Sequence, residues 1–586
     1  MELQTNYRTR RRTGGGPARW VLFLLMATVI LGLGIVGILW YQDQWSNSTQ
    51  VESFSGREHP VTYQGVLLQE EDVRVVNNEH YFSMNYIKEN IDPNIFWDEQ
   101  TKAVVITTKD KVLTFPEGQV EAFVNGQPFS IRVPVEDVNG VKYIPVSPLE
   151  NIYGIRLQSL TNTGVAILEK SGDMIQVGET VVQPEKVELT YFVRQEPSTQ
   201  APYVIELGQE AKVHIFGEEK GWYYVQTLDG LVGYLDKKDV QLEGITQITL
   251  EVEDKKRIPW SPLGGKINLT WEHVVSRNPD HSKISPMPGL HVVSPTWFDL
   301  VNGEGEISSK ASLPYVEWAH QQGYQVWGLF SNNFDPDITT TALATYETRS
   351  KMVRQLVQYA SMYKLDGINI DFENVYLKDK ENLVQFVREL TPYLHEQNLV
   401  VSMDVTIKST SERWSMFYDR ARLAQTVDYM IVMTYDEHWA SSPVAGSVAS
   451  LPWVEKGLQG VLEEVPASKL LLGVPYYTRL WKEETDPSTG KVRVTSKAIT
   501  MDTTDKWIKE RNLTPGYDEK SGQMYVEYKD QADGATYKIW IEDEMSMKKR
   551  TELVKKYNLA GIASWRRGFE KPGIWNAIAE TLEKKP

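Results

Sequence analysis

A row of acids and amides in residues 366–374 carries the clearest chemistry in the sequence. The stretch reads DGINIDFEN and alternates large apolar residues with polar ones. A β-strand points successive side chains to opposite faces, so Asn369, Asp371 and Glu373 share one face. Several carboxyl groups in one space of low dielectric constant do not all ionise easily, and at least one pKa rises. A carboxyl group that keeps its proton near neutral pH can act as a general acid.

Two other interpretations of this acidic row are open. The strand could face water, or it could bind a divalent metal ion together with carboxylates from other strands, for which Asp404 and Asp436 are available. A strand that faces water has no need of the apolar Ile368, Ile370 and Phe372 on its other side. The alternation therefore favours a catalytic acid over a metal site or a purely structural strand.

The surrounding sequence predicts the fold that must position these residues. From about residue 264, short apolar segments alternate with amphipathic helical ones, such as residues 381–394, in which Leu383, Phe386, Val387, Leu390 and Leu394 fall on one face. This alternation predicts a parallel sheet closed into a (β/α)8 TIM barrel over residues 264–586. A long gap before the last strand predicts a small α+β insertion at about residues 482–545. The eight predicted strands are residues 266–271, 290–295, 324–330, 366–373, 399–405, 428–435, 469–477 and 559–565.

The barrel explains why one strand is apolar on one side and acidic on the other. The apolar side packs outward under the helices, and the polar side points into the barrel. Barrel interiors are usually filled with branched apolar side chains, so a polar row there suggests function. Glu373 ends the strand, at the face where enzymes of this fold carry their active sites.

Three motifs in this order resemble glycoside hydrolase family 18, the chitinase-like enzymes. The family pattern on the fourth strand is Asp-x-x-Asp-x-Asp-x-Glu, which Asp366, Asp371 and Glu373 match, whereas Asn369 stands where the family usually has Asp. The family's Met-x-Tyr-Asp element and its barrel-floor tryptophan are matched by Met433, Tyr435, Asp436 and Trp565. The resemblance covers residues 264–586, and the phrase NIDFENV is similar to the version found in spore-peptidoglycan hydrolases.

The resemblance implies substrate-assisted hydrolysis, in which the nucleophile is the 2-acetamido group of the sugar. Glu373 would protonate the leaving glycosidic oxygen and later deprotonate the attacking water. Asp371 would orient the acetamido N–H and stabilise the positive oxazolinium intermediate. Tyr435 would donate a hydrogen bond to the acetamido oxygen. The expected product keeps the β configuration.

The resemblance also implies a set of substrate-binding residues. Asp436 would contact a sugar hydroxyl, Trp565 would form an apolar floor under the sugar, and Asn369 and Met433 would complete the site. The implied partner is an N-acetylated polysaccharide, either peptidoglycan or a chitin-like glycan. No metal ion or organic cofactor is needed. Further aromatic residues near strand ends are candidates either for sugar stacking or for core packing: Trp271, Trp297, Trp327, Trp439, Tyr476 and Trp481.

Asn369 departs from the family pattern in a way that affects the chemistry. In the usual family pattern, an Asp at this position shares a proton with its neighbour. An Asn can donate a hydrogen bond to Asp371, but it cannot take up a proton. We therefore expect a shifted pH–rate profile rather than loss of activity.

The N-terminus predicts export and a membrane anchor. The uncharged apolar residues 21–40 match the roughly 20 residues that cross a bilayer. Basic residues before this run predict a cytoplasmic tail at residues 1–19, an anchor at 20–41, a linker at 42–59 and the remainder outside the cell membrane, facing the wall or spore cortex. A cleaved signal peptide is the alternative. The basic residues are Arg8, Arg10, Arg11, Arg12 and Arg19.

Two smaller domains are predicted between the linker and the barrel. Residues 60–172 contain strand-like patches and Asn-Gly turns, and they resemble the copper amine oxidase N-terminal-like domain, a small α+β or β domain. Residues 186–243 resemble the bacterial SH3-like domain, a small β-barrel, through Pro197, Gly208, Trp222 and Gly233-Tyr234. Either domain could bind cell wall or serve as a spacer.

The composition excludes some functions, and three possible functions remain. A net charge of −16 argues against a nucleic-acid partner, and the absence of cysteine removes disulfides, thiolate metal sites and cysteine nucleophiles. The favoured function is a membrane-anchored glycosidase that cleaves β-linked N-acetylglucosaminyl bonds. The alternatives are a lectin-like wall protein and a wall-tethering scaffold. The acid Glu373, which a lectin would not need, favours the enzyme.

Overall fold

The computed structural model describes residues 18–43, 46–182, 189–250 and 257–583. Chain contacts divide the protein into two compact units. The first comprises Met1–Tyr86 and Val141–Glu253, and the second comprises Ile87–Gly140 and Asp254–Pro586. The boundary cuts through the predicted domain at residues 60–172, because its middle part groups with the barrel.

The first described helix, α1, spans Ala18–Asp43. Within the part of the chain that the structure describes, no helix combines the length and the apolar character that crossing a membrane requires. The predicted transmembrane anchor at residues 20–41 is therefore not supported. Most of the predicted cytoplasmic tail, residues 1–17, lies outside the described residues.

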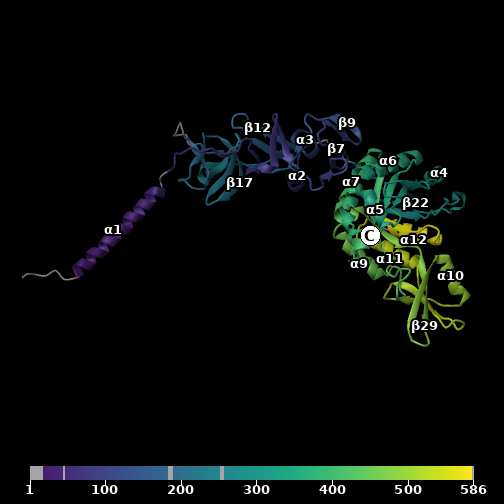
Figure 1. The fold of residues 1–586 in the computed structure, drawn as a ribbon. Coiled ribbons are helices and arrows are strands. Elements are labelled where there is room, and N and C mark those ends of the chain that lie inside the picture. The colour runs from purple at the N-terminus through teal and green to yellow at the C-terminus, as the bar shows by residue number, and fades with distance from the viewer. Residues whose placement is uncertain (1–17, 44–45, 183–188, 251–256, 584–586) are drawn as a thin grey trace, which may run out of the picture. The chain divides into compact units, whose positions relative to one another are not determined.

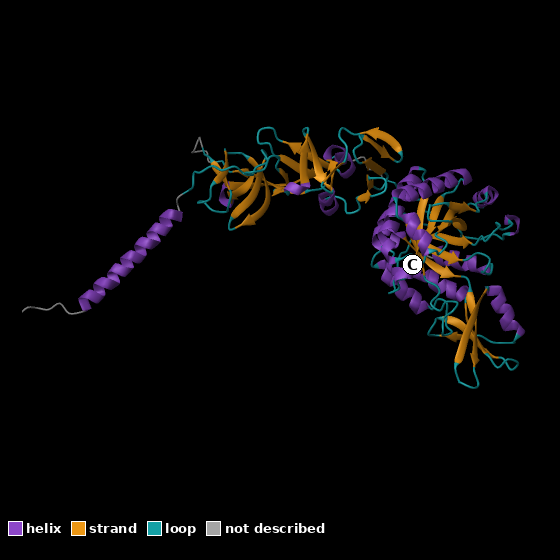
Figure 2. Cartoon of the chain, in the orientation of Figure 1, coloured by secondary structure: helices purple, strands orange, loops and turns teal. Residues whose placement is uncertain are grey.

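The first unit is built mainly from antiparallel strands (Figure 2). One sheet has the order β12-β13-β1-β2, a second has the order β10-β11-β4-β3, and a third joins seven strands in the order β16-β15-β19-β18-β17-β14-β20. The third sheet is the SH3-like region, and it recruits β14 from before the predicted start at residue 186. The elements are β1 (Val61–Tyr63), β2 (Val66–Leu67), β3 (Val73–Val76), β4 (Glu79–Ser83), β11 (Val141–Pro145), α3 (Val146–Tyr153), β12 (Ile155–Ser159), β13 (Ala166–Lys170), β14 (Met174–Thr180), β15 (Tyr191–Arg194), β16 (Tyr203–Leu207), β17 (Lys212–Glu219), β18 (Trp222–Thr227), β19 (Val232–Asp236) and β20 (Val240–Gln247). By the division above, β10 (Glu136–Val138) and most of α2 (Met84–Asn90) count with the second unit.

Eight parallel strands of the second unit close into a barrel, as predicted (Figure 1). The order β21-β34-β28-β27-β26-β25-β24-β22 returns on itself because β21 also pairs with β22. Each strand overlaps one of the eight predicted segments. They are β21 (Ile267–Glu272), β22 (Val292–Leu300), β24 (Gln325–Ser331), β25 (Gly367–Asp371), β26 (Val400–Thr406), β27 (Tyr429–Met433), β28 (Leu470–Pro475) and β34 (Gly561–Trp565), with β23 (Ile307–Ser309) added antiparallel to β22.

Helices surround this barrel and cover the outward side of its strands (Figure 2). The predicted face of α7 is buried, including Leu383, Phe386 and Leu390. Ile368, Ile370 and Phe372 of the β25 segment belong to the same apolar cluster as this helix face. A separate apolar cluster fills the barrel interior. The helices are α4 (Leu313–Gln321), α5 (Pro336–Leu343), α6 (Tyr346–Tyr363), α7 (Lys380–Glu396), α8 (Arg420–Thr426), α9 (Leu451–Leu462), α11 (Glu544–Lys556) and α12 (Gly573–Glu583), with a short π-helix, η5, at Glu412–Met416.

The predicted α+β insertion forms a five-stranded antiparallel sheet with one helix, in the order β30-β29-β33-β32-β31. It begins slightly earlier than residue 482, since β29 starts directly after the seventh barrel strand. A small core around Trp507 and Ile539 holds it together. Its elements are β29 (Thr478–Thr485), β30 (Val492–Ile499), α10 (Met501–Glu510), β31 (Gly516–Asp518), β32 (Gln523–Lys529) and β33 (Thr536–Ile541).

A second five-stranded sheet, from residues 96–130, packs on the barrel helices. It runs in the order β5-β6-β7-β8-β9. Arg388 of α7 donates to the Thr107 carbonyl oxygen at 2.5 Å, and Arg422 of α8 donates to Asn94 Oδ1 at 2.8 Å. These contacts explain why residues 87–140 group with the barrel. The strands are β5 (Phe96–Asp98), β6 (Ala103–Thr107), β7 (Val112–Pro116), β8 (Glu121–Val124) and β9 (Gln127–Ser130).

Candidate active site

Glu373 lies just beyond the end of β25, and its main chain is held from two sides. Asn332, at the end of β24, donates from Nδ2 to the Glu373 carbonyl oxygen at 2.8 Å and accepts the Glu373 N–H at 3.0 Å. On the other side, the Tyr418 hydroxyl donates to the Phe372 carbonyl oxygen at 2.8 Å. Asn332 and Tyr418 are both buried. The predicted acid therefore projects from a rigid support.

Asn369 lies deeper in the barrel, within a hydrogen-bond network that joins three other strands. Its Oδ1 accepts hydrogen bonds from Trp271 Nε1 at 2.9 Å and from Ser294 Oγ at 3.2 Å. Its Nδ2 donates to Asp404 Oδ1 at 2.9 Å. The sequence suggested Asp371 as the partner of this amide. The amide reaches Asp404 instead because β25 pairs with β26, where Asp404 faces the same interior.

Asp371 and Glu373 both have raised pKa values. Burial raises the pKa of Asp371 to about 7. Burial also raises the pKa of Glu373 well above its ordinary value, and the negative charges of Asp371 and Asp436 raise it further. The surroundings of Glu373 therefore favour its protonated form, which is the form that a general acid requires. Asp371 Oδ1 is buried and has no hydrogen-bond partner among the described residues.

Tyr435 follows the end of β27 and points its hydroxyl toward the same group of acids. Burial raises the pKa of this phenol well above its ordinary value, and the nearby charge of Asp404 adds to the effect. The hydroxyl therefore keeps its proton and can donate a hydrogen bond. Met433, the last residue of β27, is buried.

Asp436 is exposed at the barrel mouth, and its backbone is in the left-handed region with φ of 61°. The Tyr477 hydroxyl donates to Asp436 Oδ1 at 2.6 Å, and Arg479 Nη2 lies 3.4 Å from the same oxygen. Arg479 thus pairs with a predicted site residue.

Trp565 ends the last barrel strand and is only partly buried. Its ring lies 5.9 Å from the Trp271 ring and 5.9 Å from the His273 ring, measured between centroids. It packs on the apolar cluster inside the barrel. This location suits an apolar floor beneath a bound sugar.

The other aromatic candidates separate clearly by burial. Trp439 is 52% exposed and can stack on a ligand. Five candidates are buried and act as packing residues: Trp271, Trp297, Trp327, Tyr476 and Trp481.

Three residues near the site carry weaker sequence signals. Asn332 and Tyr477 contact the predicted site residues Glu373 and Asp436. Tyr418 contacts the main chain between Asp371 and Glu373, and none of the three belongs to the motifs. Asn332 follows the third strand in the run Ser-Asn-Asn, and a polar run at a strand end is the signal that could have drawn attention to it.

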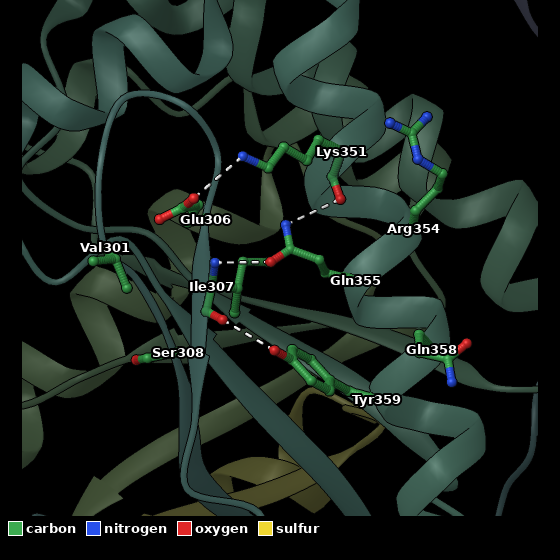
Figure 3. A pocket seen from close by; sticks show the side chains of 9 residues that line it. All are labelled: Val301, Glu306, Ile307, Ser308, Lys351, Arg354, Gln355, Gln358 and Tyr359. Atoms are coloured by element: carbon green, nitrogen blue, oxygen red, sulfur yellow. Dashed lines mark hydrogen bonds and ion pairs between the residues drawn. The ribbon is translucent and has the colours of Figure 1, made fainter.

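Within the described residues, no group of three or more His, Asp or Glu side chains is arranged to hold a metal ion. A surface hollow lies between β23 and α6, lined by Glu306, Lys351, Gln355 and Tyr359 among others (Figure 3). None of the predicted site residues lines this hollow.

Family comparisons agree with the motifs. Residues 330–570 match the model for Glycosyl hydrolases family 18. Residues 66–168 match the Copper amine oxidase N-terminal domain, and residues 189–241 match the Bacterial SH3 domain. The chain therefore carries a family 18 glycosyl hydrolase domain preceded by these two domains, which confirms all three resemblances.

Three curated proteins illustrate the similarity. The uncharacterized glycosylase YvbX of Bacillus subtilis (strain 168) is 28% identical over 285 residues, 47% of this chain and 80% of YvbX. The putative sporulation-specific glycosylase YdhD of the same organism is 28% identical over 385 residues, 60% of this chain and 86% of YdhD. The cortical fragment-lytic enzyme of Bacillus anthracis is 26% identical over 263 residues, 44% of this chain and 59% of that enzyme. Together with the family match, these relatives identify the chain as a glycoside hydrolase.

Proposed function

We propose that this chain hydrolyses β-linked N-acetylglucosaminyl bonds of peptidoglycan or a chitin-like glycan, with Glu373 as the acid and base. The observation that carries the proposal is the arrangement at the end of β25. Glu373, whose buried surroundings raise its pKa, follows on a main chain held by Asn332 and lies near Asp371, which has a pKa of about 7 and a buried oxygen without a hydrogen-bond partner among the described residues. This pair supplies the proton and the negative charge that the reaction requires.

In the first step, Glu373 gives its proton to the glycosidic oxygen. The carbonyl oxygen of the sugar's 2-acetamido group attacks C1, and the bond from C1 to the leaving oxygen breaks. The resulting oxazolinium ion is positive. Asp371 accepts a hydrogen bond from its N–H and stabilises the charge, while Tyr435 donates to the acetamido oxygen before it attacks.

In the second step, water attacks C1 from the side that the leaving group occupied. The Glu373 carboxylate takes a proton from this water, the bond from C1 to the acetamido oxygen breaks, and the acetamido group is restored. The two displacements at C1 together retain the β configuration. Asp436 and Trp565 hold the sugar ring at the mouth, with Asn369 and Met433 supporting the site from below.

The names of the relatives support this substrate class. They include a cortical fragment-lytic enzyme, a putative sporulation-specific glycosylase and, at 26% identity over 295 residues, chitinase A1 of Niallia circulans. To separate the substrates, the full chain is incubated with purified spore cortex, vegetative cell wall and chitin oligomers, and the products are identified by mass. We expect new reducing ends on an N-acetylglucosaminyl unit from at least one of them.

The residue test is Glu373→Gln, which keeps the shape of the side chain but cannot donate a proton. General acid–base catalysis typically contributes about 10²–10⁴-fold, so the variant should lose at least that much kcat/KM. Glu412→Gln, an exposed change in η5, is the control. Turnover by Glu373→Gln at the wild-type rate would remove Glu373 from its role. Sugar binding by the wild type without release of reducing ends would indicate a lectin instead.

We also propose that the enzyme acts outside the cell membrane. The proposal rests on the arginines and the apolar run at residues 21–40 of the sequence, and the anchor itself has no support from the structure. Protease added to intact cells should degrade the catalytic domain. Recovery of the intact chain in the cytosolic fraction would contradict export.

A further inference from the structure

Asp404 is a buried acid that none of the steps above uses. It lies on β26, on the inward side of the strand, and is 1% exposed. Its neighbours on the outward side, Met403 and Val405, belong to the apolar cluster beneath the helices. Burying a carboxyl group without an opposite charge is costly, so its presence requires an explanation.

The contact with Asn369 shows how Asp404 is connected to the site. Trp271 Nε1 can only donate a hydrogen bond, so the Asn369 atom that faces it must be the oxygen. Ser294 Oγ also lies at this oxygen. The Asn369 NH₂ group is thereby directed at Asp404 Oδ1. The amide orientation is set by its surroundings, and Asp404 accepts a hydrogen bond from it.

The surroundings of Asp404 disfavour a negative charge on it. The charged neighbours that act on it are both acids, Asp371 and Glu373. Burial raises the pKa of Asp404 well above its ordinary value, and the charge of Asp371 raises it further. The hydrogen bonds from Asn369 and Trp271 act in the opposite direction and offset only part of this rise. The titratable and polar groups that face Asp404 from the elements around it are Asp371 and Glu373 of the β25 segment, Trp271 of β21, Tyr435 after β27 and Tyr418 before α8.

We infer that Asp404 is a positioning residue that stays protonated beside the site and, through Asn369, leaves Asp371 as the acid that ionises. The inference rests on the proposed function. Two carboxylates in this pocket would repel each other and raise the pKa of Asp371, which must be ionised to stabilise the oxazolinium ion. A neutral Asp404 avoids this repulsion and still accepts the hydrogen bond that orders Asn369.

The first test detects the proton directly and needs no substrate. Infrared difference spectra of the full chain, with aspartate labelled by ¹³C at the side-chain carboxyl, report protonated aspartic acids separately from Glu373. At neutral pH we expect an aspartic acid C=O band that is absent in Asp404→Asn. The band should persist in Asp371→Asn, which keeps the test meaningful if Asp404→Asn does not fold. If no band is assignable to Asp404 at neutral pH, the inference is overturned.

The second test asks whether activity requires the neutral form of Asp404. Asp404→Ala removes the acceptor for Asn369 and should lower kcat/KM at least tenfold. Asp404→Asn keeps an oxygen acceptor and cannot ionise, so it should recover most of that loss. An Asp404→Asn variant as weak as the alanine variant would show that a charge is required and would overturn the inference. Full activity in Asp404→Ala would also overturn it.

These outcomes are distinguishable from failure of the proposed function. The infrared band depends only on the protonation of Asp404, whereas the proposed function depends on product release and on Glu373→Gln. A chain that lacks glycosidase activity but shows the band would disprove the function and leave the protonated acid in place.

Discussion

Asn332 binds both polar groups of the Glu373 main chain with the two ends of one side-chain amide. The donor distance is 2.8 Å and the acceptor distance is 3.0 Å. No other amide geometry satisfies both groups at once, because one end must donate and the other must accept. The link joins the third barrel strand to the residue that follows the fourth, so the position of the acid depends on a neighbouring strand.

Replacing Asn332 should therefore reduce catalysis through the position of Glu373, and not through a contact between Asn332 and the substrate. Losing a hydrogen bond to a buried partner costs about 1–3 kcal/mol, so Asn332→Ala should lower kcat/KM roughly 10- to 100-fold, mostly through kcat. The control is Asn333→Gly, which removes the exposed neighbouring side chain and suits the positive φ at that residue. An unchanged kcat in Asn332→Ala would show that the clamp does not position Glu373.

The pH dependence of kcat/KM should be bell-shaped with its acidic limb near pH 7. Asp371 must lose its proton to stabilise the intermediate, and its pKa is about 7, so activity rises as the pH increases through that value. Glu373 must keep its proton, so activity falls at higher pH as its raised pKa is passed. Initial rates from pH 4 to pH 10 on one oligosaccharide check this. An acidic limb near pH 4 would show that Asp371 ionises normally.

Asn369→Asp should move that profile. The variant replaces the amide that donates to Asp404 with a fourth carboxyl group, beside those of Asp371, Glu373 and Asp404. One proton must then be shared between residues 369 and 404, and the added acid disfavours ionisation of Asp371. We expect the acidic limb to shift to higher pH. A profile identical to the wild type would contradict the role assigned to this network.

The contribution of Asp371 to the free energy of unfolding should decrease as the pH rises. Its pKa is raised in the folded chain from 3.8 to about 7, so the stability it contributes is complete below about pH 4 and is lost as the pH rises toward 7. Each unit of pKa shift corresponds to about 1.4 kcal/mol. Asp371→Asn should therefore unfold at higher denaturant concentration than wild type at pH 8 and at a similar concentration at pH 4. Tryptophan fluorescence can follow both transitions, and equal differences at the two pH values would refute the prediction.

Replacement by alanine should affect substrate binding at Trp439 and stability at Trp481. Trp439 is exposed at the mouth, so Trp439→Ala should raise KM for long oligosaccharides roughly three- to tenfold and leave stability unchanged. Trp481 is buried and donates from Nε1 to the Gly446 carbonyl oxygen at 2.8 Å. Trp481→Ala should destabilise the chain by about 3–5 kcal/mol. A stable Trp481→Ala variant with weakened sugar binding would reverse these assignments.

The periodic parts of the fold were predictable from the sequence, and the contacts between strands were not. The eight barrel strands and the two faces of DGINIDFEN follow from apolar patterns within a few neighbouring residues. The partner of Asn369 lies 35 positions away on the next strand, and its identity depends on the register between β25 and β26. The contact between Asn332 and Glu373 could not be predicted for the same reason, since the two residues are 41 positions apart.

The limits of the domains were also only partly predictable from the sequence. The sequence of residues 60–172 resembles one domain, and its middle part nevertheless groups with the barrel. The hydrogen bond from Arg422 to Asn94 is one of the contacts between this part and the barrel, and neither residue lies in a sequence pattern that predicts the contact.

The sheet at residues 96–130 has a consequence for how the enzyme can be divided. Arg388, Arg422 and the Tyr346 N–H of the barrel helices all find hydrogen-bond partners in residues 94–107. A protein that begins at residue 264 would expose these groups, although it would contain all eight barrel strands. The compact unit that contains the barrel consists of two stretches separated in the sequence, so a truncation that follows the motif boundaries cuts through it.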